Sequence, residues 1–77
     1  MVVNFKSVDQ TLQNYSVICK KSDIFNKIEN KLYEDNEKYY ETANYFTVNG
    51  IKIHKNKSLE FNHIKNNDTI ILNILEI

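Results

Sequence analysis

Few side chains in this sequence could do chemistry, and their spacing argues against an enzyme. Cys19 is the single cysteine and falls on the inward-facing positions of an expected strand, where a thiol behaves as a small apolar group. His54 and His63 lie in polar segments without the cysteines or spaced carboxylates that would complete a metal site. Glu34 and Asp35 are neighbours in a polar segment, with no apolar cleft to raise the pKa of a carboxyl group. One glycine cannot form a phosphate-binding loop. We therefore expect no catalytic residue, no metal and no cofactor.

The length and composition predict one small intracellular domain. The 77 residues suffice for a single hydrophobic core, so we assign residues 1–77 to one domain. A lone cysteine excludes an intramolecular disulfide and favours a reducing compartment, the cytoplasm or the nucleus. Apolar residues nowhere continue for about 18 positions, so we expect no contact with a membrane. We also expect a monomer.

The charged residues are balanced overall but unevenly placed. Ten basic and ten acidic residues give a net charge of zero, which removes the long-range attraction typical of nucleic-acid-binding proteins. The acidic residues gather in the middle of the chain, at Glu29, Glu34, Asp35, Glu37 and Glu41. The basic residues gather in the later third, at Lys52, His54, Lys55, Lys57, His63 and Lys65. We interpret the two groups as solvated faces of opposite sign.

The first half of the chain has the pattern of a β-hairpin followed by a helix. Two strands, joined by a polar loop at 7–14, are predicted by apolar residues at every second position: Val3 and Phe5, then Tyr15, Val17 and Cys19. An amphipathic helix over 24–35 is predicted by the helical spacing of Ile24, Phe25, Ile28 and Leu32. We expect Ser22 or Asp23 to be the N-cap, and Asn36 to end the helix in a left-handed conformation.

The second half predicts three further strands. Residues 35–44 form a charged and aromatic connection. Residues 45–53 form a hairpin around Asn49 and Gly50, which both tolerate the positive φ of a tight turn. The last strand spans 69–75, with Ile70, Leu72 and Ile74 on one side. This order predicts an α+β fold, a mixed four- to five-stranded sheet with one helix packed across it, which is the β-grasp.

With this order the chain resembles the ubiquitin family over nearly its whole length. The second half, residues 46–74, matches ubiquitin without a gap through Phe46, Gly50, Ile53, Leu59, Ile64, Thr69, Ile70 and Leu72. The resemblance implies that the loop before the last strand folds back over the open end of the sheet. Its two isolated apolar residues, Leu59 and Ile64, would then close the bottom of the core. Asn62 occupies the position where the family usually has a tyrosine that bonds back to the backbone.

The resemblance also implies a binding surface on the sheet face opposite the helix. Ubiquitin has an apolar patch there, and the matching positions are Thr47, Ile71 and Asn73, with Val8 or Leu12 beside them. Because two of the three are polar, receptors that insert apolar helices against ubiquitin would lose contact energy. We expect outward-pointing apolar side chains around them to favour docking of a protein partner. The predicted partner-binding residues are Tyr45, Thr47, Ile51, Ile71, Asn73 and Leu75.

Three hypotheses on function follow. The first is a ubiquitin-like interaction module of a larger intracellular protein, which docks on a protein receptor of the ubiquitin pathway or a similar one. The second is a modifier or sulfur carrier whose Gly-Gly end was removed, or a non-conjugated splicing-type modifier in which Asp23 pairs with a partner's arginine. The third is a nucleic-acid-binding β-grasp that uses Lys52, Lys55, Lys57 and Lys65, although the balanced charge argues against nucleic acid as a partner.

Overall fold

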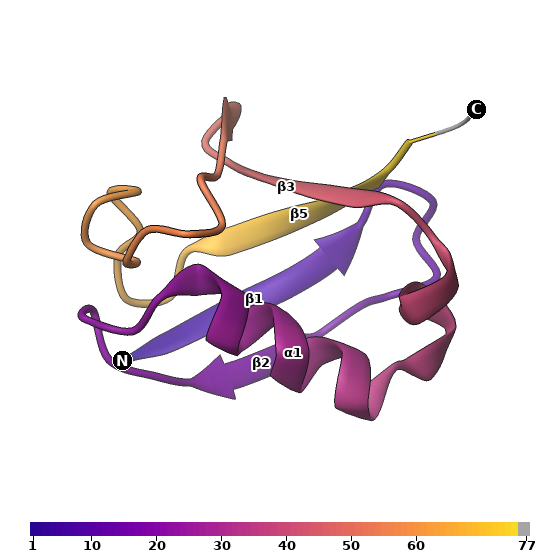
Figure 1. The fold of residues 1–77 in the computed structure, drawn as a ribbon, viewed down its shortest axis with the longest axis horizontal. Helices are drawn as coiled ribbons and strands as arrows, with labels where there is room; N and C mark the ends of the chain where they lie inside the picture. Colours follow the sequence, from indigo (N-terminus) through magenta and orange to yellow (C-terminus); the bar gives the residue numbers. More distant parts are fainter. Residues whose placement is uncertain (76–77) are drawn as a thin grey trace.

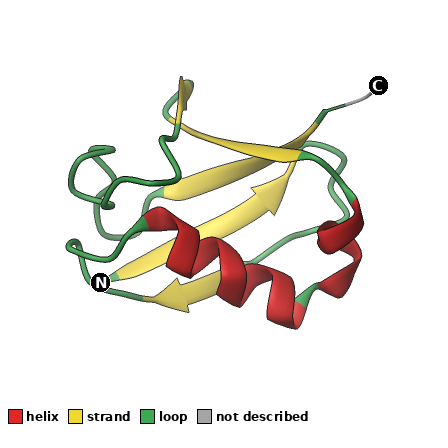
Figure 2. Cartoon of the chain, viewed as in Figure 1, coloured by secondary structure: helices red, strands yellow, loops and turns green. Residues whose placement is uncertain are grey.

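The computed structural model describes residues 1–75, so Glu76 and Ile77 of the predicted domain lie outside the described residues. Within this range the elements are β1 (Val2–Ser7), β2 (Tyr15–Ile18), α1 (Phe25–Asp35), the 3-10 helix η1 (Glu37–Glu41), β3 (Asn44–Val48), β4 (Ile51–Lys52) and β5 (Thr69–Ile74). Figure 1 shows α1 lying across one face of the sheet, and Figure 2 shows η1 directly after it. The predicted order of elements is confirmed, with η1 as an addition inside the connection at 35–44.

The sheet is mixed and has the strand order β2-β1-β5-β3-β4. β1 and β5 run parallel and pair Phe5 with Ile70, whereas the other neighbouring strands are antiparallel. The first and last strands therefore lie side by side inside the sheet (Figure 1). A parallel pair requires a long crossover, and α1 belongs to that crossover. The predicted α+β fold of the β-grasp type is confirmed.

The hydrophobic core lies between α1 and the sheet. Phe25, Ile28 and Leu32 follow one another at helical spacing, and all three have no exposed surface. The ring centroid of Phe25 lies 5.0 Å from that of Phe46 and 6.3 Å from that of Phe5. The inward positions of the strands supply the rest of the core: Val3, Phe5, Val17, Phe46, Val48, Ile70 and Leu72. Cys19 is buried with them, as predicted.

The start of α1 differs from the prediction. Neither Ser22 nor Asp23 is the N-cap, because Ile24 takes that position without a side-chain hydrogen bond. Instead the free N–H groups of Phe25 and Asn26 donate to the carbonyl oxygens of Lys57 and Lys55, both at 2.9 Å. The Asp23 carboxylate accepts a hydrogen bond from the Lys20 N–H at 2.9 Å in the preceding turn. This bond lowers the pKa of Asp23.

The end of α1 also differs from the prediction. Asn36 has φ −140°, so it does not adopt the left-handed conformation. Its side-chain amide donates to the Leu32 carbonyl oxygen at 3.0 Å and satisfies a carbonyl of the last turn. η1 then begins at once and buries the Tyr39 ring, which is 2% exposed. The connection at 35–44 is therefore a packed segment of the core and not an open loop.

The loop before β5 closes the bottom of the core as predicted. Leu59 is fully buried and Ile64 is 4% exposed. Asn62 supports the backbone of this loop through its side chain. Its Oδ1 accepts from the His54 N–H at 2.8 Å, and its amide donates to the carbonyl oxygens of His54 and Ser58 at 3.0 and 2.9 Å. The hairpin turn is also as predicted, with Asn49 at φ 51° and Gly50 at φ 78°.

Candidate protein-binding surface

The sheet face opposite α1 carries a row of four side chains that crosses four strands. The register pairs Lys6 with Ile71, Ile71 with Thr47, and Thr47 with Lys52. Successive side chains of a strand point to opposite faces, and the neighbours of these residues in β1, β3 and β5 are buried in the core. The row therefore faces away from the helix. Tyr45 and Asn73 form the adjacent pair on the same face.

The structure places five of the six predicted partner-binding residues in the outward register. Tyr45, Thr47, Ile71 and Asn73 are half-buried members of β3 and β5. Leu75 follows β5 in the same alternation, is 53% exposed, and donates its N–H to the Ala43 carbonyl oxygen at 2.8 Å. These five residues, together with Lys6 and Lys52, are called the open face below.

Ile51 does not belong to the open face, which corrects the sequence-based expectation. The two-residue turn at 49–50 pairs Ile51 with Val48, and residues paired across a hairpin point to the same side. Val48 is a core residue, so Ile51 takes the opposite side from Thr47 and Tyr45. It is nevertheless 69% exposed, because β4 is a short strand at the edge of the sheet.

Val8 and Leu12 were the two residues expected beside the binding patch, and the structure excludes Leu12 from this surface. Leu12 is 4% exposed and belongs to the core, and its N–H donates to the Ser7 hydroxyl oxygen at 2.9 Å. Val8 is 65% exposed and continues the outward alternation of Asn4 and Lys6 beyond the end of β1. Val8 is thus the residue of this loop that remains available beside the open face.

The open face is basic as well as partly apolar. The five described strands contain two charged residues, Lys6 and Lys52, and no Asp or Glu. Both lysines lie in the row that contains Ile71. The Lys52 Nζ atom lies 5.5 Å from the centre of the Tyr45 ring, where a cation is attracted by the ring electrons. Apolar side chains between two ammonium groups favour an acidic partner.

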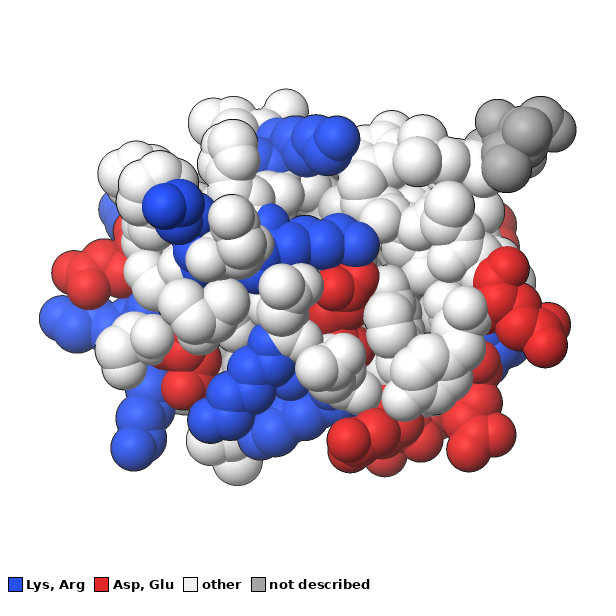
Figure 3. Space-filling model, viewed as in Figure 1, with Lys and Arg blue, Asp and Glu red and all other residues white. Residues whose placement is uncertain are grey.

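The two charged groups predicted from the sequence are exposed except for one residue in each. Figure 3 shows acidic side chains gathered at the end of the molecule where α1 passes into η1. Glu34, Asp35, Glu37 and Glu41 are exposed there. Glu29 is instead only 7% exposed, and its Oε2 atom lies 2.6 Å from the ammonium of Lys55. The interpretation as two solvated faces was therefore wrong for Glu29 and Lys55.

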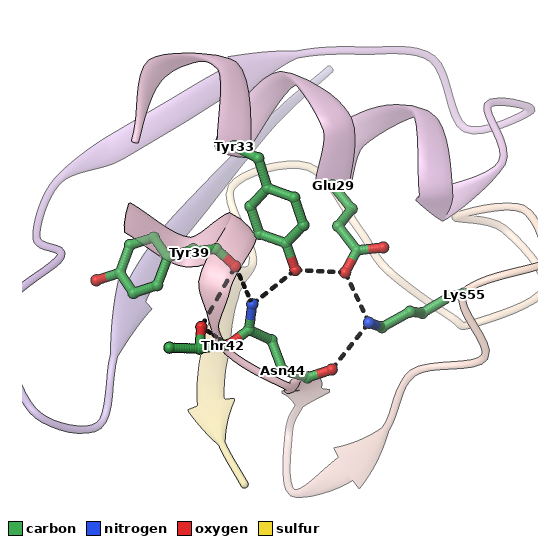
Figure 4. Close-up of polar contacts among 6 residues, drawn as sticks. All are labelled: Glu29, Tyr33, Tyr39, Thr42, Asn44 and Lys55. Atoms are coloured by element: carbon green, nitrogen blue, oxygen red, sulfur yellow. Dashed lines mark hydrogen bonds and ion pairs between the residues drawn. The ribbon is translucent and has the colours of Figure 1, made fainter. Parts of the chain in front are cut away.

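Glu29 and Lys55 belong to a partly buried hydrogen-bond network that links α1, β3 and the segment after β4 (Figure 4). The Tyr33 hydroxyl donates to Glu29 Oε2 at 2.6 Å, and the Asn44 amide donates to the Tyr33 oxygen at 2.9 Å. The Lys55 ammonium also donates to the Asn44 carbonyl oxygen at 2.8 Å. Burial, and next the hydrogen bond to Glu29, raise the pKa of Tyr33. We call these four residues, Glu29, Tyr33, Asn44 and Lys55, the Glu29 network.

The Glu29 network was not visible in the sequence as a unit. The spacing of four residues between Glu29 and Tyr33 places them on one side of a helix, which is the one local signal. Lys55 lies 26 residues further along the chain, so only the fold brings it to Glu29. Its ammonium is engaged there, which removes Lys55 from the basic group that the nucleic-acid hypothesis requires.

The remaining residues of chemical interest have separate roles. Burial raises the pKa of the Cys19 thiol and so disfavours the reactive thiolate. Asp35 accepts a hydrogen bond from the Tyr15 hydroxyl at 2.6 Å. Among residues 1–75, no three His, Cys, Asp or Glu side chains are grouped closely enough to hold a metal ion. No helix in this same part of the chain has the length and apolar character needed to cross a membrane.

Comparison with protein-family models and with curated proteins finds no match for this chain. Any proposal about its function therefore rests on the fold and the surfaces described above.

Proposed function

We propose that this domain is a ubiquitin-like protein-interaction module that docks on a receptor through the open face. The observation that supports it best is the row Lys6, Ile71, Thr47 and Lys52, which places an apolar side chain between two cations on an uncovered side of the sheet. Receptors of the ubiquitin pathway, in the cytoplasm or the nucleus, are the partners we propose.

The chemistry of the open face defines the receptor further. Ile71 and Tyr45 can accept one apolar side chain, whereas Lys6 and Lys52 can each pair with a carboxylate. Thr47 and Asn73 make the centre of the open face polar. The Asn73 amide already donates to the Ile71 carbonyl oxygen at 3.2 Å. We therefore expect an acidic amphipathic helix or strand as the receptor element, and weak binding to receptors that offer only apolar residues.

The experiment is a titration of the isotope-labelled domain with ubiquitin-receptor domains, followed by amide chemical shifts. Shifts should gather at Tyr45, Thr47, Ile71 and Asn73. Ile71→Thr, which keeps a β-branched residue, should weaken binding about tenfold. The matched control is Ile18→Thr, at an outward position of β2 that is 80% exposed, and it should bind as the wild type does. Shifts confined to α1, with the open face silent, would refute the proposed surface.

A further inference from the structure

A second surface lies beside the open face, between β4 and the loop that contains Phe61. The residues around it form a shallow hollow of 440 Å³, lined among others by Ile51, Lys52, His54, Phe61 and His63. Figure 1 shows the two segments that form it, the β3–β4 turn and the loop of residues 58–64, at the same end of the sheet. We call it the Phe61 hollow.

The Phe61 hollow exposes two large apolar side chains that contribute little to the core. Phe61 is 54% exposed and Ile51 is 69% exposed. The Phe61 ring packs edge-to-face against the His54 ring at 5.9 Å, and the Lys57 Nζ atom lies 5.4 Å from its centre. Aromatic side chains, Phe included, are enriched in protein interfaces relative to the rest of the protein surface.

The backbone of the Phe61 hollow is fixed before any partner arrives. Asn62 ties the loop to both backbone groups of His54 through its side chain. The N–H of Phe61 donates to the Ser58 hydroxyl oxygen at 3.0 Å, and the N–H of His63 donates to the Glu60 carbonyl oxygen at 3.0 Å. A partner would therefore lose little free energy in ordering this surface.

The charges around the hollow select the class of partner. Lys52 lines the hollow and Lys57 lies over the Phe61 ring, whereas Glu60 is the one acidic residue among the described residues of the lining. We propose that the Phe61 hollow binds a short acidic protein segment, in which one apolar side chain packs between Ile51 and Phe61 and flanking Asp or Glu residues pair with Lys52 and Lys57. This surface is additional to the open face and does not depend on the receptor proposed for it.

Two other occupants fit the same observations less well. A second copy of the chain would bring Lys52 and Lys57 against the same lysines in a symmetric contact, where like charges repel. A nucleic acid would need an open ring face for base stacking, and the Lys57 ammonium covers one face of Phe61. The net charge of zero also gives the domain no long-range attraction for a polyanion.

The test is selection of random displayed dodecapeptides on the wild-type domain, followed by anisotropy titrations of the enriched peptides. We expect enriched sequences with an apolar residue flanked by Asp or Glu. Phe61→Ser and Ile51→Ser should each weaken their binding at least tenfold. The matched control is Tyr40→Ser, which removes another aromatic side chain that is 58% exposed but lies far from the hollow in η1. Lys57→Glu should weaken binding, whereas Lys38→Glu, on η1, should not.

Several outcomes would overturn the proposal. Failure to enrich peptides over a Phe61→Ser bait, enrichment of peptides without acidic residues, or equal binding by wild-type and Phe61→Ser domains would each do so. A wild-type dimer that Phe61→Ser dissociates in sedimentation runs would assign the hollow to a second copy. Oligonucleotides that shift the Phe61 amide more than the peptides do would assign it to nucleic acid. Circular dichroism of each variant shows whether a loss of binding reflects unfolding.

Discussion

Replacing Lys55 with methionine should destabilise the domain far more than removing an ordinary surface lysine. The Lys55 ammonium lies 2.6 Å from Glu29 Oε2 and 2.8 Å from the Asn44 carbonyl oxygen. The Glu29 side chain is 9% exposed, so its carboxylate depends on partners inside the protein. Methionine retains most of the apolar stem, so the variant removes mainly the ammonium, which also lies 5.4 Å from the centre of the Phe46 ring.

The size of this effect follows from the exposure of the pair. Breaking a fully buried ion pair costs about 3–5 kcal/mol, whereas an exposed pair contributes about 0.2–1 kcal/mol. The Lys55 side chain is 34% exposed, and Tyr33 still donates to Glu29 after the substitution. We therefore expect a loss of about 2 kcal/mol in the free energy of unfolding. For a domain of this size that corresponds to a fall in Tm of about 8–16 °C.

Urea unfolding at neutral pH, followed by circular dichroism, measures the loss. The control is Lys27→Met, because Lys27 is 62% exposed and its Nζ atom lies 3.4 Å from Asp23, and it should cost less than about 0.5 kcal/mol. Glu29→Gln should cost less in the Lys55→Met background than alone, with a coupling of at least about 1 kcal/mol. Equal costs for Lys55→Met and Lys27→Met, or strictly additive losses in the double variant, would refute the role of the Glu29 network.

Three further substitutions test other parts of the structure. Leu59→Ala should cost about 2–5 kcal/mol in urea unfolding, because it opens a cavity at a fully buried site, while Leu75→Ala at a 53% exposed site should cost little. Gly50→Ala should cost about 1 kcal/mol in the same assay from its φ of 78° alone, because nothing lies within 4 Å of the added Cβ, and an unchanged stability would contradict this turn. Burial, and next the hydrogen bond to Asp35, raise the pKa of Tyr15 from 10.0 to about 12, so the folded protein retains a proton that the unfolded chain loses. The stability that Tyr15 contributes is fully present below pH 10 and is lost as the pH rises toward 12. The free energy of unfolding of Tyr15→Phe should therefore decline less steeply over this range than that of the wild type. Parallel declines of the two proteins would contradict the shift in pKa.

The helices and strands with a regular spacing of apolar residues could be predicted from the sequence, whereas the contacts between distant segments could not. Alternation located β1, β2 and β5, and the helical spacing of Phe25, Ile28 and Leu32 located α1. The predicted N-cap of α1 was wrong. The first N–H groups of the helix donate to the carbonyl oxygens of Lys55 and Lys57, which lie about thirty residues further along the chain. No local pattern distinguishes these carbonyls from any others.

The predicted partner-binding surface shows the same difference between local patterns and long-range contacts. Tyr45, Thr47, Ile71 and Asn73 share a face because strand alternation is a local property. Ile51 was assigned to the wrong side even though the sequence held the needed signal. A two-residue turn at Asn49 and Gly50 pairs residue 48 with residue 51, so the core position of Val48 already fixed the side of Ile51. The Phe61 hollow had no such signal, since it depends on how the loop folds over the end of the sheet.

Lys52 belongs to both proposed surfaces, so a comparison of its substitution with substitutions at the other residues distinguishes the two interactions. Its ammonium lies over the Tyr45 ring on the open face, and its side chain also lines the Phe61 hollow. A carboxylate that pairs with Lys52 in the hollow would draw the ammonium away from Tyr45, so the two partners would compete for one cation. Lys52→Glu should therefore weaken both interactions, whereas Ile71→Thr should weaken only receptor binding and Phe61→Ser only peptide binding. If the receptor and the acidic peptide bind independently, and Lys52→Glu affects one of them alone, the two surfaces do not share this lysine.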